Sequence, residues 1–139
     1  MAFTLTREHV LSIFKDTEKG NWDTLIEAID PNVHWWISSD VKDPLSKSGI
    51  YNLQEWKDNI NAGLKSHLKD GYLEMKLDSL DVIGLKAIAE CSGFAVQNDG
   101  DLYQNRFAWF LVFSAETGKI VGIREYMHSA LVKEMFSKE

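Results

Sequence analysis

Four side chains that can move or stabilise charge stand in or beside apolar segments. Asp40 follows a short run of β-forming residues, Glu90 lies in the middle of an apolar segment, and Arg124 and His128 lie near the end of another. A carboxyl group in a closed apolar pocket has a raised pKa and can exchange a proton with carbon. A histidine can transfer protons near neutral pH without such help. These four residues are the predicted catalytic groups.

Each assignment has an alternative that the sequence leaves open. Asp40 could be a solvated loop residue in Ser-Ser-Asp, and His128 could face solvent or a second subunit. Glu90 could form a structural ion pair with Arg106 or Arg124 across a sheet, because a carboxylate among apolar residues is costly unless it is paired or protonated.

A second group of residues could form the walls of a substrate pocket. Asn105 could donate a hydrogen bond to a substrate carbonyl, or it could be a satisfied amide at a sheet edge. Large aromatic rings that could line an apolar cavity are Trp36, Tyr51, Trp56, Trp109 and Tyr126.

Hydrophobic spacing and turn signals predict the elements that position these side chains. Helices are predicted over 6–19, 21–29 and 52–68, and strands over 33–37, 72–83, 85–97, 102–113 and 119–128, with a closing helical turn over 130–136. Asn98-Asp99-Gly100 marks a hairpin. Helices that precede an antiparallel meander indicate an α+β fold, with the helices on one face of a curved sheet.

Side chains alternate between the two faces of a strand, so inward-facing residues come in sets. If Asn105 points inward, so does Trp109, and if His128 points inward, so do Arg124 and Tyr126. The first strand offers two sets, and alternation alone leaves open which of them faces the pocket: His34 and Trp36, or Val33, Trp35 and Ile37.

Composition excludes several classes of function. The 139 residues predict a single domain over 1–139, with 45% hydrophobic and 26% charged residues. The net charge of −6 argues against nucleic-acid binding. No apolar run is long enough to span a membrane, no secretory signal is visible, and the single Cys91 fits a cytoplasmic protein. Neither metal-ligand spacing nor a cofactor motif is present, so no metal and no cofactor are expected.

Three motifs resemble a known family. Asp30-Pro31-Asn32-Val33-His34-Trp35 is similar to D-x-x-V-x-W at the start of a first strand, and 44–51 is similar to P-L-x-G-x-Y with two extra residues. Tyr103-Gln104-Asn105-Arg106-Phe107, Gly118-Lys119-Ile120 and 124–128 are similar to Y-x-N-x-[YF], D-G-K-I and R-E-Y-x-D. The chain thus resembles the SnoaL-like polyketide cyclases, within the cone-shaped fold shared with ketosteroid isomerases, limonene-epoxide hydrolases and nuclear transport factor 2.

The resemblance implies a function and a partner. It points to a cofactor-independent cyclase or isomerase that acts by acid-base catalysis on a polyketide- or terpenoid-like intermediate. The alternatives are epoxide opening and non-catalytic binding of an apolar small molecule, since this fold hosts enzymes and binders alike. His128 replaces the aspartate that many members carry, while Asp40 falls near the base of ketosteroid isomerases. A homodimer is expected, with Arg106, Phe110 and Val112 on the face opposite Asn105.

Overall fold

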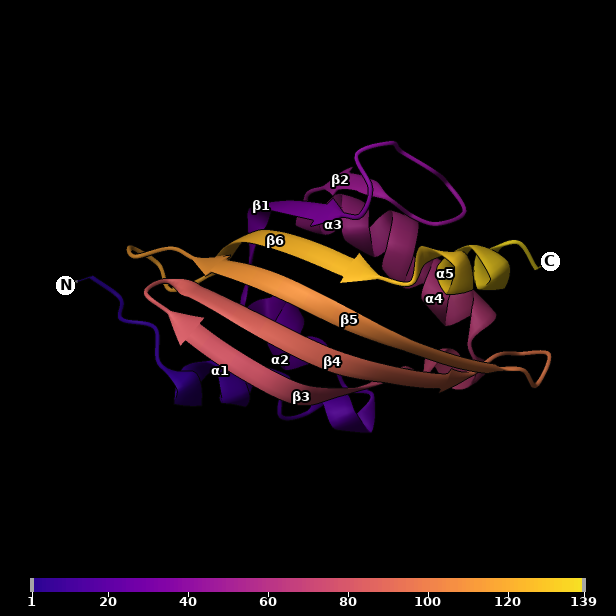
Figure 1. Ribbon diagram of the computed structural model, residues 1–139, viewed down its shortest axis with the longest axis horizontal. Coiled ribbons are helices and arrows are strands. Elements are labelled where there is room, and N and C mark those ends of the chain that lie inside the picture. Colours follow the sequence, from indigo (N-terminus) through magenta and orange to yellow (C-terminus); the bar gives the residue numbers. More distant parts are fainter. Residues whose placement is uncertain (1, 139) are drawn as a thin grey trace.

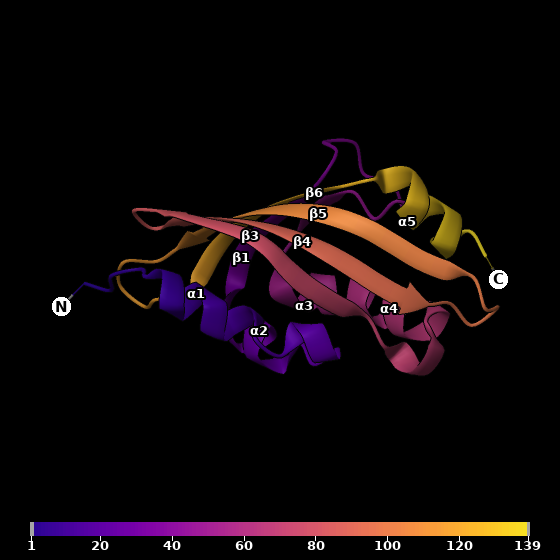
Figure 2. The same cartoon turned by 60° about the horizontal axis from the view of Figure 1, so that its bottom comes forward.

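The computed structural model describes residues 2–138, which form a curved sheet with the first helices against its inner face and the last helix beyond the end of the last strand (Figures 1 and 2). The strands are β1 (Ile29–Ile37), β2 (Gly49–Tyr51), β3 (Glu74–Ile83), β4 (Lys86–Val96), β5 (Leu102–Phe113) and β6 (Ile120–Met127). The helices are α1 (Arg7–Phe14), α2 (Asp23–Glu27), α3 (Leu53–Trp56), α4 (Ala62–His67) and α5 (Ser129–Phe136), and a π-helical segment (Lys57–Asn61) joins α3 to α4. Single 3-10 turns cover Thr17–Lys19 and Lys69–Gly71.

The sheet order is β2-β1-β6-β5-β4-β3, and every neighbouring pair is antiparallel except β1 and β6. The predicted α+β class and cone-like arrangement are confirmed. Two details differ from the sequence prediction. β1 begins at Ile29 and passes through Pro31, which is tolerated because the register with β6 shifts between Ile29 and His34. The short strand β2 pairs with β1, whereas the sequence predicts no strand over these three residues.

The first helix is shorter than predicted because a buried threonine ends it. α1 stops at Phe14, and the Thr17 hydroxyl lies within 2.8 Å of the carbonyl oxygens of both Phe14 and Met75. Gly20 then takes a left-handed conformation with φ of 75°. The hydroxyl thus joins the helical layer to β3 in the sheet.

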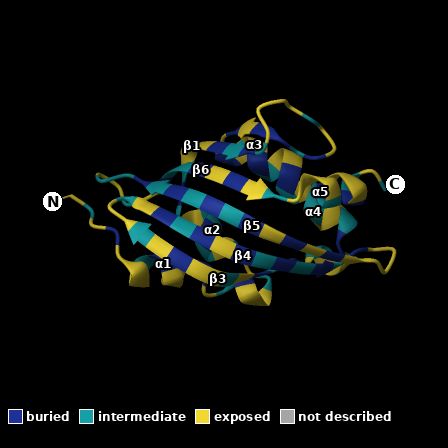
Figure 3. Ribbon diagram, in the orientation of Figure 1, coloured by how far each residue is buried: buried dark blue, intermediate teal, exposed yellow. Residues whose placement is uncertain are grey.

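Burial alternates along the strands, as the colours in Figure 3 show. Along β5 the inner set is fully buried, namely Tyr103, Asn105, Phe107, Trp109, Leu111 and Phe113. At the centre of the core the rings of Trp35 and Trp56 stack with centroids 4.6 Å apart. The concave face therefore carries a layer of tryptophans between sheet and helices.

The C-terminal helix α5 closes one end of this layer. It packs beside α4 and buries Val132 and Met135 in a second apolar cluster with Tyr103 (Figure 1). Beyond the helix, Lys138 lies 2.9 Å from Asp99 and 2.8 Å from Asp101, in the turn between β4 and β5. No helix among residues 2–138 is both long and apolar enough to cross a membrane.

The Thr17 hydroxyl provides a first test of this architecture. Thr17→Val keeps the shape but leaves the Met75 carbonyl without its side-chain partner, so we expect a loss of about 1–3 kcal/mol in the free energy of unfolding. Urea denaturation measures the change. Thr4→Val at an exposed position is the matched control and should change stability little; equal effects of the two substitutions would contradict the role assigned to Thr17.

The outer face of the sheet suggests how two copies could pair. Phe110 and Tyr126 lie there with ring centroids 5.9 Å apart, and the Arg124 guanidinium lies 4.9 Å from the Phe110 ring. Asp78 and Glu90 are exposed on the β3–β4 half of the same face. We propose that this face forms a twofold dimer, because the symmetry would set the arginine-bearing half of one copy against the carboxylate-bearing half of the other.

Light scattering at micromolar concentration should then give about twice the 15.9 kDa chain mass. Arg124→Glu should shift the population toward monomer, because it places like charges opposite each other. Lys65→Glu on the helical side should leave the mass unchanged. A monomeric wild-type protein would rule out this interface.

Candidate functional site

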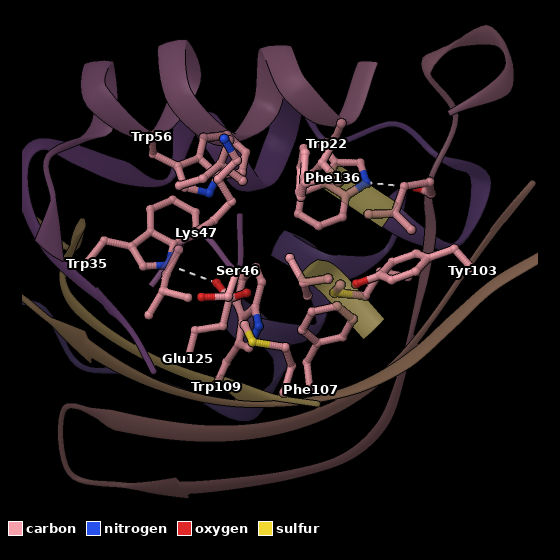
Figure 4. Close-up of a pocket in the computed structure, with 17 residues that line it drawn as sticks. Trp22, Trp35, Ser46, Lys47, Trp56, Tyr103, Phe107, Trp109, Glu125 and Phe136 are labelled. Carbon is pink, nitrogen blue, oxygen red and sulfur yellow. Dashed lines mark hydrogen bonds between the residues drawn. The ribbon is translucent and has the colours of Figure 1, made fainter. Parts of the chain in front are cut away.

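A cavity of about 50 Å³ lies between the concave face of the sheet and the helices (Figure 4). Seven aromatic rings line it: Trp22, Trp35, Trp56, Tyr103, Phe107, Trp109 and Phe136. Three further lining residues carry polar groups: Ser46, Lys47 and Glu125. An apolar wall with a few convergent polar groups is the usual composition of a small-molecule site.

Glu125 is the one carboxylic acid among the lining residues. It lies on the inner face of β6, and only 7% of the residue is exposed. Its Oε1 accepts a hydrogen bond of 2.9 Å from the indole N–H of Trp35, drawn as a dashed line in Figure 4. Burial raises the pKa of Glu125 to about 7, and the Trp35 hydrogen bond opposes this rise because it favours the charged form.

Strand pairing and ring stacking hold Glu125 in place. In the parallel pair, Ile37 of β1 lies beside Glu125, and Trp35 is two residues away on the same face. The stack of Trp35 on Trp56 is nearly parallel, with an angle of 11° between the rings. The indole that donates to the carboxylate is therefore fixed by packing, and so is the carboxylate.

The opposite end of the cavity carries a tyrosine hydroxyl. Tyr103 accepts a 3.0 Å hydrogen bond from the Asn105 amide, and burial raises the pKa of Tyr103 to about 12. Lys47 closes the rim, with its ammonium 4.7 Å from the centre of the Phe136 ring. The cavity therefore pairs a titratable carboxyl group with a tyrosine that remains neutral at physiological pH.

Four of the predicted site residues lie inside the fold. Trp56 and Trp109 line the cavity. Tyr51 is buried, but its hydroxyl donates to backbone carbonyls of the loop, 3.0 Å from that of Lys47. The Asn105 side chain serves the structure, since besides Tyr103 it bonds to both backbone polar groups of His128, at 3.2 Å each.

The predicted catalytic residues do not line the cavity. Asp40 is exposed and accepts a 2.9 Å hydrogen bond from Trp36, and Glu90 is exposed and accepts one of 3.1 Å from Ser79. His128 is exposed and directly precedes α5. All three side chains therefore lie outside this cavity, which agrees with the solvent-exposed alternative for Asp40 and His128.

Three further predicted site residues lie on the outer face of the sheet, away from the cavity: Trp36, Arg124 and Tyr126. Trp36 and Tyr126 contact each other on the outer face, with ring centroids 5.0 Å apart, and Arg124 lies on that face too. Strand alternation fixes the outcome, because the inner positions of β6 are Ile123, Glu125 and Met127. The assumption that His128 points inward implied that Arg124 and Tyr126 do so as well, and these residues belong to the outward-facing set of β6.

Glu125 is the residue that sequence reasoning missed. The signal was present in the alternation, since Glu125 stands two residues from Ile123 and two from Met127 and so shares a face with both. Trp35 follows from the same logic on β1, where Val33 and Ile37 are its apolar neighbours on the buried face. Across residues 2–138, no three His, Cys, Asp or Glu side chains are grouped so that they could hold a metal ion.

The sequence matches no protein-family model and no curated protein. Solved structures resemble the fold closely. A nuclear transport factor 2-like protein of unknown function from Burkholderia pseudomallei shares 15% identity over 94% of this chain and 96% of its own, with a TM-score of 0.73.

Two further structures carry functional names. A protein from Jannaschia classed as a SnoaL-like polyketide cyclase shares 15% identity over 95% of this chain and 91% of its own, with a TM-score of 0.66. A pinacolase from Penicillium brevicompactum shares 12% identity over 92% and 89%, with a TM-score of 0.69. The chain therefore has the cone-shaped fold of the nuclear transport factor 2-like proteins, among which the SnoaL-like cyclase is found.

Proposed function

We propose that this chain is a cofactor-independent cyclase or isomerase that transfers protons at carbon, with Glu125 as the acid-base group. The observation that carries the proposal is the position of this carboxyl group: it stands at the wall of an aromatic cavity and has one hydrogen-bond donor, Trp35, at 2.9 Å. A general base is most effective when its pKa lies near the working pH, and a value of about 7 meets that condition.

The reaction class follows from the chemistry of a lone buried carboxylate. In its ionised form Glu125 takes a proton from the carbon next to a carbonyl group, and the electron pair of that C–H bond moves to form an enolate. The enolate then either regains the proton at another carbon, which shifts a double bond, or attacks a second carbonyl and closes a ring. Protonated Glu125 returns the proton in either case, so no external oxidant or reductant is needed.

The walls favour a largely apolar substrate, such as a polyketide- or terpenoid-like intermediate. Seven of the lining residues are aromatic, and the polar groups are few. The cavity of about 50 Å³ admits only a small part of such a molecule. Binding of a larger substrate therefore requires movement of rim side chains, of which Lys47 and Phe136 are in contact with each other. The SnoaL-like cyclase and the pinacolase with this fold support the reaction class by analogy alone.

Deuterium exchange provides the test. Cyclohexanone in heavy water loses its α-hydrogens to solvent when a base removes them, and proton NMR follows the loss. The protein should accelerate this exchange, and Glu125→Gln should reduce the protein-dependent rate about a hundredfold or more. Glu125→Asp keeps the carboxyl group but shortens its reach, so it should retain part of the rate.

Glu90→Gln is the matched control, because Glu90 is the same residue type on the opposite face of the sheet. This variant should exchange at the wild-type rate. Full activity of Glu125→Gln would refute the assignment. Ketone binding without any protein-dependent exchange would instead indicate a module that binds apolar molecules and performs no chemistry.

The protonation state of Glu125 also affects stability. Its pKa is raised from 4.5 to about 7 in the folded chain, so the folded state holds a proton that the unfolded state has released between these values. The free energy of unfolding that Glu125 contributes is therefore greatest at acidic pH and falls as the pH rises through about 7. The loss is on the order of 3 kcal/mol, since one pKa unit corresponds to about 1.4 kcal/mol.

Urea denaturation at pH 5 and pH 8 measures this contribution. Glu125→Gln removes the titrating group, so the variant should gain about 3 kcal/mol relative to wild type between the two pH values. The difference between Glu125→Gln and wild type cancels the effects of all other titrating groups. A constant difference between wild type and Glu125→Gln would show that Glu125 titrates at its ordinary pKa.

A further inference from the structure

One buried hydrogen-bond donor has no acceptor within the described part of the chain. Trp109 is 1% exposed, and its indole N–H makes no hydrogen bond. Three other tryptophans donate to acceptors at 2.9 Å: Trp22 to the Leu73 carbonyl, Trp35 to Glu125 and Trp36 to Asp40. An unsatisfied buried donor costs stability, so its retention calls for a partner that comes from outside the chain.

The orphan donor lies beside the proposed acid-base group. Trp109 on β5 is the direct cross-strand partner of Glu125 on β6, and the side chains of both line the cavity (Figure 4). Directly opposite residues in an antiparallel pair have Cβ atoms about 5 Å apart. A ligand group that enters the cavity therefore lies next to both side chains, and a small shift of the Trp109 ring would bring its buried N–H into contact with the ligand.

Neighbouring rings hold the Trp109 indole in one orientation. Phe14, Trp22 and Trp35 surround it, with centroids 6.0, 6.2 and 5.9 Å from the Trp109 ring. These contacts come from α1, the segment before α2, and β1, so three separate parts of the chain fix the same side chain. A donor fixed in this way stabilises a developing negative charge without reorganisation during the reaction.

We propose that the Trp109 N–H donates a hydrogen bond to the carbonyl oxygen of the substrate and makes the site selective for neutral ketones over hydrocarbons of the same shape. This inference rests on the proposed function and names its substrate class. When Glu125 removes the α-proton, negative charge moves onto the carbonyl oxygen, where the Trp109 hydrogen bond strengthens. A carboxylate ligand fits poorly, because it would bring a second negative charge to the ionised Glu125.

Two ligands that differ in one group test the donor. Cyclohexanone and methylenecyclohexane have nearly the same shape, but only the ketone can accept a hydrogen bond. Wild type should bind the ketone about tenfold more tightly, and Trp109→Phe should bring the two affinities close to equality. The informative quantity is the ratio of the two dissociation constants, since a change in cavity shape alone affects the binding of both ligands alike.

Glu125→Gln separates this inference from the proposed function. That variant should lose deuterium exchange and keep its preference for the ketone. If Glu125→Gln exchanges normally while Trp109→Phe loses the preference, the proposed function fails and the carbonyl site stands. A wild-type protein with no preference for the ketone, including one that binds neither ligand, overturns the inference.

A measurement on wild type covers the case in which Trp109→Phe does not fold. In the nitrogen–proton NMR spectrum, the Trp109 indole signal, assigned by its contacts to Phe14 and Trp22, should move downfield with cyclohexanone and much less with methylenecyclohexane. Equal movement with both ligands would show that the shift reports a change in packing around the indole and no hydrogen bond to the ketone, and it would overturn the inference.

Discussion

The hydrogen bond from Trp35 to Glu125 is the interaction on which the rest of the site depends. A carboxyl group behind a layer of tryptophans loses its hydration, and one indole N–H at 2.9 Å restores only part of it. This imbalance places the pKa of Glu125 near 7, where the group can both accept and return a proton. A second donor at the same carboxylate would lower the pKa toward its ordinary value, and the complete loss of the first would raise it further.

The two strands that flank β6 place a tryptophan on each side of Glu125. Because β1 runs parallel to β6 and β5 runs antiparallel to it, Glu125 has one neighbouring strand that brings Trp35 and another that brings Trp109. The first indole donates to the carboxylate, while the second keeps its N–H free of protein acceptors within residues 2–138. Two tryptophans with the same chemistry thus differ in their hydrogen bonding, and strand register together with ring packing decides which of them donates to Glu125.

Sequence reasoning was accurate where the signal is local or periodic. The hairpin at Asn98-Asp99-Gly100, the long alternating strands and the α+β order are all present in the structure, because turn residues and side-chain period determine them. The inner face of β5 was also accessible, since Asn105 and Trp109 share it with apolar residues. The error lay in the choice of which alternating set faces inward. Glu90 was selected as a carboxylate among apolar residues, but it lies on the exposed face, whereas Glu125, between Arg124 and Tyr126, lies on the buried face. Which of two alternating sets faces inward depends on the helices that pack against the sheet, and on β6 the apolar Ile123 and Met127 on either side of Glu125 indicated the buried set.

The position of α5 separates the proposed acid-base group from residues that set the size of the cavity. The proposed proton-transfer residues stand on strands in the middle of the sheet, whereas Val132 and Phe136 reach the cavity from the last turns of the chain. Lys138 attaches this terminal segment to the distant β4–β5 turn through exposed ion pairs, which contribute little energy. Substitutions at Val132 or Phe136 can therefore change the size of the cavity while Glu125 and its hydrogen bond from Trp35 stay in place.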